Sequence, residues 1–358
     1  MNDIFRHAKL LPLLLAMASL LLLVFMLGRH MNGIWMNTNV SNVFVDDTTY
    51  VMHEALIHSN DSNPVVVFIG GSVTREATII DGDFSAFYME RFGVNQKFLN
   101  LGSSNQTLAE SAALISSLKL KPGSIVFIQF SYKKLGYGEA EYNKELFRPN
   151  MPLLDYSAVR QELSYYDKVL HIFTPKILLG RNFWHYFEAK RGCSHLQLVS
   201  MESTCYESRD VVRSYYKEEN RMTSVKKDEY VNNIKNLTFK EYRKNREFSE
   251  KILSNTIRMI LGSGATPVLI EYPIDEREKE LYSLAKNDPE YKEIFERLSK
   301  NAEHFDLVSN QIFVSNDFYD SQHMLKSGKQ KSTELIAVFT NNLIEKKEKN
   351  NDHERRNH

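Results

Sequence analysis

Short runs of apolar residues divide the chain into a repeating pattern of strands and helices. Apolar residues at helical spacing lie at 107–121, after the apolar run at 96–102, and at 249–264, before the apolar run at 265–274. Continuous apolar strands that alternate with helices are typical of a parallel sheet covered on both faces. The pattern predicts an α/β fold, a three-layer sandwich with a central parallel sheet. Its expected strands lie at 65–70, 96–102, 123–130 and 265–274.

The most apolar segment, 10–27, has eighteen residues without a charge. As a helix at about 1.5 Å per residue it would be roughly 27 Å long, close to the hydrocarbon thickness of a bilayer. A cleaved signal peptide is the alternative, but its apolar region should be only about 7–15 residues. We predict a transmembrane signal anchor. Arg6 and Lys9 before it, against Arg29 after it, favour a cytoplasmic N-terminus and a periplasmic or extracellular main domain.

Between about 137 and 245 the sequence becomes charged, rich in tyrosine and helix-prone, which predicts a mainly helical insertion. Its mixed acidic residues favour a solvated helix face over a nucleic-acid surface. Basic and acidic residues number 45 each, so the net charge gives no reason to expect a polyanionic partner. The expected segments are a cytoplasmic N-terminus at 1–9, the anchor at 10–27, a juxtamembrane linker at 28–47, an α/β domain at 48–344 and a disordered charged tail at 345–358.

The two cysteines, Cys193 and Cys205, lie twelve positions apart in a polar segment. In an exported compartment they could close one surface loop as a disulfide, and two unrelated free thiols are the alternative. Their spacing does not fit a CxxC metal site. The sequence shows no cluster of metal ligands and no dinucleotide fingerprint, so no metal or cofactor is expected.

The first apolar run ends on Gly70-Gly71-Ser72, which is either a plain turn or a nucleophile at the end of a strand. In open α/β sheets the functional crevice lies beyond the carboxyl ends of the strands. A serine nucleophile needs a base, and His323 follows Asp320 by three residues. On a helical turn such residues share one face, so Asp320 could orient His323 and leave its Nε2 free to accept the Ser72 proton.

Three segments together resemble the SGNH, or GDSL-type, hydrolase superfamily. The resemblance implies an SGNH/flavodoxin-like fold in which Ser72 is the nucleophile and Asp320 and His323 complete a catalytic triad. It also implies an oxyanion hole that contains the backbone N–H groups of Ser72 and Gly102. The segments are "GGSVT" at 70–74, "NLGSSNQTLAES" at 100–111 and "YDSQHMLKSG" at 319–328.

The chain departs from the superfamily pattern in two places. Gly71 stands where the usual motif has an aspartate, and the Gly-x-Asn-Asp block after the third strand is absent, with Lys133 near the place of its asparagine. That asparagine normally donates a hydrogen bond to the oxyanion, and removing one such donor can cost about 10²–10³-fold in rate. Ser131 and Asn105 are the candidates to replace it.

Membrane-anchored members that transfer acyl groups onto cell-envelope polymers often lack the same block. The chain is similar to them in having an N-terminal anchor and a late Asp-x-x-His; examples are the D-alanyl transfer protein of teichoic acid modification and the alginate O-acetyltransferase group. The resemblance implies a serine O-acyltransferase or esterase that acts on an envelope or extracellular glycan or polyol through an acyl-Ser72 intermediate. In such systems a multi-spanning membrane acyltransferase commonly supplies the acyl group.

Two alternatives to an enzyme stay open. One is a catalytically inactive SGNH-like module that binds glycans or scaffolds an envelope complex, which the missing asparagine favours. The other is a membrane-tethered structural protein unrelated to the superfamily. Three triad residues in the right order favour the enzyme. Aromatic residues of the insertion could stack on sugar rings or belong to a core: Phe183, Trp184 and Tyr186.

Overall fold

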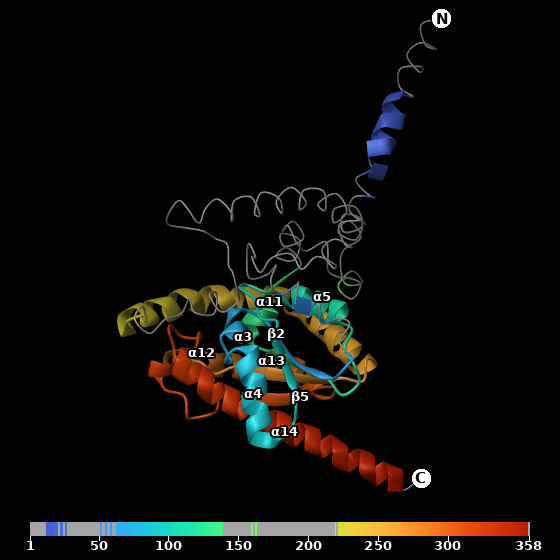
Figure 1. Ribbon diagram of the computed structural model, residues 1–358. Helices are drawn as coiled ribbons and strands as arrows, with labels where there is room; N and C mark the ends of the chain where they lie inside the picture. Colours follow the sequence, from blue (N-terminus) through green and yellow to red (C-terminus); the bar gives the residue numbers. More distant parts are fainter. Residues whose placement is uncertain are drawn as a thin grey trace, which may run out of the picture.

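A computed structural model provides the fold of this chain (Figure 1). The structure describes residues 12–20, 22, 23, 26, 51, 54, 55, 58, 62–138, 159, 162, 219 and 221–356. Most of the expected insertion at 137–245 lies outside these residues, as do Phe183, Trp184, Tyr186 and both cysteines, so the expectations for them stay predictions.

Five parallel strands form one sheet in the order β2-β1-β3-β4-β5. Three of them, β1, β3 and β4, are buried along their whole length, which explains why their sequences are apolar without alternation. The expected α/β fold with a central parallel sheet is confirmed. The strands are β1 (Val65–Ile69), β2 (Lys97–Asn100), β3 (Ile125–Gln129), β4 (Thr266–Glu271) and β5 (Glu303–Asp306).

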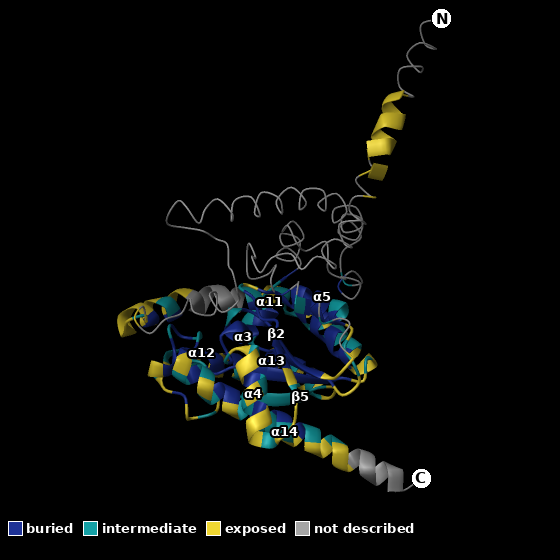
Figure 2. Cartoon of the chain, in the orientation of Figure 1, coloured by how far each residue is buried: buried dark blue, intermediate teal, exposed yellow. Residues whose placement is uncertain are grey.

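Helices cover both faces of the sheet (Figure 1). One face packs against α5 (Leu108–Leu118), α11 (Ser224–Gly262), α12 (Glu276–Asn287) and α13 (Pro289–Ser299). The other packs against α4 (Asp81–Phe92) and α14 (Lys326–Arg356). Side chains of a strand alternate between the two cores, so Val67 belongs to the first and Phe68 to the second. Figure 2 shows the inner strands buried between helices whose outer faces are exposed.

Three elements differ from the sequence pattern. Helix α14 continues to Arg356, through most of the tail at 345–358 that we expected to be disordered. The edge strand β5 has the sequence EHFD and is half-buried, so it carries none of the apolar signal of the inner strands. The helix expected at 249–264 is the last part of α11, which begins at Ser224 and crosses the expected insertion boundary at 245 without a break. No proline or glycine interrupts Ser224–Leu261, so nothing local stops the helix there.

The apolar N-terminal segment is helical at 12–20, 22, 23 and 26, and these residues are exposed. Within the described residues, no helix combines the length and the apolar character needed to cross a bilayer. The other residues of 10–27 lie outside the described part, and the membrane anchor stays a prediction.

A stack of phenylalanine rings fills the core on the α4 side. The Phe68 ring lies 4.9 Å from that of Phe127, and the rings of Phe84 and Phe98 lie 3.9 Å apart and nearly parallel. Phe68 itself is fully buried. Because its ring contacts β3, α4 and β2 at once, Phe68 links β1 to its neighbours.

Phe68→Ala should lower the free energy of unfolding by about 3–5 kcal/mol, because it removes a buried ring and leaves a cavity. Urea unfolding followed by circular dichroism measures the loss. Met89→Ala is the control, since Met89 is 48% exposed on α4 and its truncation should cost well under that amount. Equal losses in the two variants would contradict this account of the core.

Candidate active site

Ser72 lies where β1 turns abruptly into the short helix α3 (Ser72–Arg75). A Cβ on Gly70 would lie 2.2 Å from Thr74 Oγ1, and one on Gly71 would lie 2.7 Å from Lys134 Nζ. A side chain at Gly70 would therefore collide with Thr74 and Gln129, whereas one at Gly71 would displace the end of the Lys134 side chain. The turn is tied to β3 by the Gly71 N–H, which donates to Gln129 Oε1 at 2.7 Å.

The structure brings Ser72, His323 and Asp320 into one hydrogen-bonded chain. Ser72 Oγ lies 2.7 Å from His323 Nε2, and His323 Nδ1 lies 2.6 Å from Asp320 Oδ2. The other carboxylate oxygen, Asp320 Oδ1, accepts the backbone N–H groups of Gln322 and His323, both at 2.8 Å. This is the arrangement of a nucleophile, a base and the group that orients the base.

The protonation state of Asp320 determines which way the hydrogen bonds run. Burial acts to raise the pKa of this carboxyl, but hydrogen bonds from the His323 ring and from two backbone N–H groups outweigh it and hold the pKa below its usual value. An ionised carboxylate only accepts hydrogen bonds, so the His323 Nδ1–H donates to it. In the neutral imidazole Nε2 is then the acceptor for the Ser72 hydroxyl.

A buried carboxylate on α12 holds the loop that carries Asp320 and His323. Glu278 is 1% exposed and accepts hydrogen bonds from Ser321 Oγ and Gln322 Nε2, each at 2.7 Å. It also forms an ion pair with Lys133, which lies on the short helix α6 (Tyr132–Leu135) after β3. Glu278 therefore links the loop that carries Asp320 and His323 to the segment that follows β3. The ammonium group of Lys133 is engaged in this ion pair.

A second buried contact fixes the same loop to α11. Lys227 Nζ lies 3.0 Å from Asp275 Oδ2 and donates to the backbone oxygens of Ser315 and Phe318. Burial would raise the pKa of Asp275, but hydrogen bonds from Ser315, Arg277 and Lys227 together lower it. The Asp275 backbone N–H donates to Ser321 O at 2.8 Å. The ion pair thus connects α11, the start of α12 and the loop that carries Asp320 and His323, called the triad loop below.

Tyr230, also on α11, lies near the same carboxylates. Burial, followed by the negative charges of Asp320 and Glu278, raises the pKa of Tyr230 to about 12. A tyrosine with such a pKa is neutral at physiological pH, so it presents a polar hydroxyl and no charge to the triad loop.

The four oxyanion candidates differ in their surroundings. Gly102 contacts α3 closely, since a Cβ there would lie 2.5 Å from Arg75 N, and its N–H donates to Asn100 Oδ1 at 3.0 Å. Ser131 caps α6 (Tyr132–Leu135), and its hydroxyl accepts the Lys134 N–H at 3.3 Å. Asn105 is exposed in a turn with a left-handed φ of 55°. Ser72 N–H lies in the first turn of α3, which offers it no acceptor within the helix.

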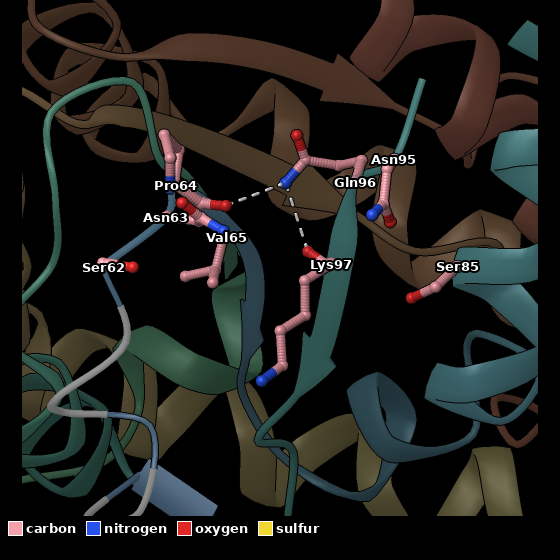
Figure 3. Close-up of a pocket in the computed structure, with 8 residues that line it drawn as sticks. All are labelled: Ser62, Asn63, Pro64, Val65, Ser85, Asn95, Gln96 and Lys97. Carbon is pink, nitrogen blue, oxygen red and sulfur yellow. Dashed lines mark hydrogen bonds between the residues drawn. The ribbon is translucent and has the colours of Figure 1, made fainter. Parts of the chain in front are cut away.

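A separate pocket of about 350 Å³ lies at the opposite end of the sheet (Figure 3). Pro64 and Val65 at the start of β1 and Gln96 and Lys97 at the start of β2 line it, and Gln96 Nε2 donates to Pro64 O at 3.3 Å. It is thus remote from the triad. Across the described ranges, no group of three or more metal-ligating side chains is found.

Sequence reasoning missed several residues that build the site: Asn100, Gln106, Gln129, Lys134, Lys227, Asp275 and Glu278. All are buried polar or charged side chains. Asn100 and Gln129 end their strands and Asp275 caps a helix, which are local signals that could have marked them. The partners of Lys227 and Glu278 lie 43 or more residues away in sequence, and no local pattern points to them.

Comparison with known proteins adds no assignment to this geometry. No family model matches the chain, and no curated protein matches it at a significant level.

Lys227→Met should lower the free energy of unfolding by about 3–5 kcal/mol, because it leaves the Asp275 carboxylate buried without its cationic partner. The matched control is Lys226→Met, the exposed neighbour on the same helix turn. Urea unfolding of the two variants gives the comparison. A loss in Lys227→Met no larger than in Lys226→Met would show that the ion pair does not hold the loop.

The stability of the protein should fall in acid, and Asp320 should contribute to the fall. Its folded-state pKa lies below the unfolded value of about 3.9, so the unfolded chain binds more protons as the pH drops. The contribution is complete above the unfolded pKa and is lost as the pH falls through the folded pKa. Asp320→Asn lacks this titration, so between about pH 5 and about pH 2 its urea midpoint should shift less than that of the wild type. An equal shift would contradict the pKa assignment.

Proposed function

We propose that the chain is a serine-dependent O-acyltransferase or esterase of the SGNH type, with a flavodoxin-like α/β domain. The observation that carries the proposal is the hydrogen-bonded chain from Ser72 through His323 to Asp320. Further support comes from the position of Ser72 at the carboxyl end of β1, beside β3, where the strand order reverses direction.

The first half-reaction transfers an acyl group to the serine. Ser72 Oγ attacks the acyl carbonyl carbon while its proton passes to His323 Nε2, and Asp320 stabilises the imidazolium that forms. The tetrahedral intermediate then collapses, the bond to the leaving group breaks, and His323 returns the proton to that group. The product is an ester of Ser72.

The second half-reaction decides between a transferase and an esterase. A hydroxyl of a glycan or polyol gives its proton to His323 Nε2 and attacks the acyl-Ser72 carbonyl, which forms the acylated acceptor and restores Ser72. Water in the same place gives a carboxylic acid. The expected anchor at 10–27 and the missing asparagine block favour transfer to an envelope or extracellular polymer, with a multi-spanning membrane acyltransferase as the source of the acyl group. The domain would then lie outside the cytoplasm.

An inactive SGNH-like module that binds glycans is the second candidate, and one observation favours it. The Gly102 N–H, an expected oxyanion donor, is bonded to Asn100 Oδ1, and the side-chain donor of the third block is absent. Such a module would have no need for the 2.7 Å contact between Ser72 and His323.

A fluorophosphonate probe distinguishes the two candidates. Its phosphorus is attacked by Ser72 Oγ, the P–F bond breaks, fluoride leaves and the serine proton passes to His323. Full-length wild-type protein in a mild detergent should gain the mass of one adduct. The Ser72→Ala variant should gain none. The labelling rate should fall by about 10⁶-fold in His323→Ala and about 10⁴-fold in Asp320→Ala.

Ser104→Ala is the control, because Ser104 is a serine of the neighbouring loop whose hydroxyl accepts a hydrogen bond from Arg75 at 2.8 Å. It should label like the wild type. A folded wild type that gains no adduct, or a Ser72→Ala variant that still gains one, would overturn the acyl-Ser72 mechanism and leave the binding module as the better proposal.

A further inference from the structure

The two departures of this chain from the SGNH pattern meet at one side chain, Lys134. This lysine is 6% exposed and comes from α6, directly after β3. Its ammonium group lies 2.7 Å from the place that a Cβ of Gly71 would occupy. The usual motif has an aspartate at that place, so the glycine leaves room for the ammonium group one residue before the nucleophile.

The position of the ammonium group is fixed by the loop after β2. Lys134 Nζ donates to the backbone oxygen of Gln106. The side chain of Gln106 is itself fully buried, and its Oε1 accepts the Gly70 N–H at 2.7 Å. Lys134 therefore joins the loops that follow β1, β2 and β3, which meet at the carboxyl edge of the sheet beside Ser72.

Lys133, the residue nearest in sequence to the missing asparagine, is committed elsewhere, because it pairs with Glu278. Gly102, the backbone donor implied by the family resemblance, gives its N–H to Asn100 Oδ1. The reaction nevertheless needs a donor where negative charge develops on the acyl oxygen. An ammonium group has three N–H donors that rotate together, so it can bond a carbonyl oxygen and an oxyanion at the same time.

We propose that Lys134 is the side-chain oxyanion donor of this site, in addition to the Ser72 N–H, and that Gly71 is a glycine in order to accommodate its ammonium group. The inference rests on the proposed function and names a catalytic residue within it. A buried cation also fits the chemistry, because a charge-assisted hydrogen bond to an anion is about twice as strong as a neutral one.

The test measures the rate constant for labelling of Ser72 by the fluorophosphonate probe, whose phosphonyl oxygen occupies the oxyanion site. Lys134→Met should lower this rate by about 10²–10³-fold, while the exposed Lys292→Met should leave it unchanged. Gly71→Ala should lower it to a similar extent with Lys134 still present, because the added methyl group displaces Nζ. The φ of −78° at Gly71 is open to alanine, so this variant keeps its backbone.

A double-mutant cycle tests the link between the two positions. If Gly71→Ala acts by displacing Lys134, it should have little further effect in a Lys134→Met background. The downfield N–H proton of His323 in the NMR spectrum should persist in each variant, since the triad itself is untouched. If a variant lost this NMR signal as well as its labelling rate, Lys134 would have a structural role, and the inference would be overturned.

The outcomes separate this inference from the proposed function. Suppose that the wild type is labelled and that both single variants are labelled at rates within about threefold of the wild-type rate. This result would overturn the role of Lys134 and leave the acyl-Ser72 mechanism standing, because the loss of one oxyanion donor should lower the rate far more. Additive effects of the two substitutions would overturn the pairing of Gly71 with Lys134. Absence of labelling in the folded wild type would overturn both proposals.

Discussion

The site depends on one constraint: a loop that begins far along the chain must be held over the end of β1. His323 follows Ser72 by 251 residues, and the hydrogen bond between them is only 2.7 Å long. The loop is held from several sides, by Glu278 on α12, by Lys227 on α11 and by the Asp275 backbone. On the proposed function, a displacement of about 1 Å would spoil the reacting geometry, and these contacts oppose such a displacement.

The carboxyl end of the sheet is accordingly polar, although it is buried. The two cores beneath it are built from aliphatic and aromatic side chains, whereas Gln106, Gln129, Asp275 and Glu278 fill the space among the loops. Buried polar groups are costly unless hydrogen-bonded, and the carboxamides and carboxylates here have several partners each. Such a network specifies one arrangement of the loops, because any other would leave donors or acceptors unmet.

Strands β1 to β4 and the contact of Ser72 with the Asp320–His323 pair could be predicted from sequence because their signals are local. An apolar run marks a buried strand, and Asp320 and His323 stand three residues apart, so each pattern fits in a short window. The edge strand β5 was not predicted, because Glu303, His304 and Asp306 are polar or charged and only Phe305 is apolar. Lys134 and Glu278 escaped for a different reason: a lysine or glutamate in a helical stretch usually faces solvent, and only the packing of distant elements reveals that these two do not.

The long separation between Ser72 and His323 also has a consequence during synthesis. On the proposed function, the nucleophile is made first, and some 250 further residues must follow before its base exists. At about 5–20 residues per second, a growing chain carries an unassisted serine for a span of tens of seconds. On that proposal, Ser72 has no base until the segment that carries Asp320 and His323 has been made and has folded against the end of β1.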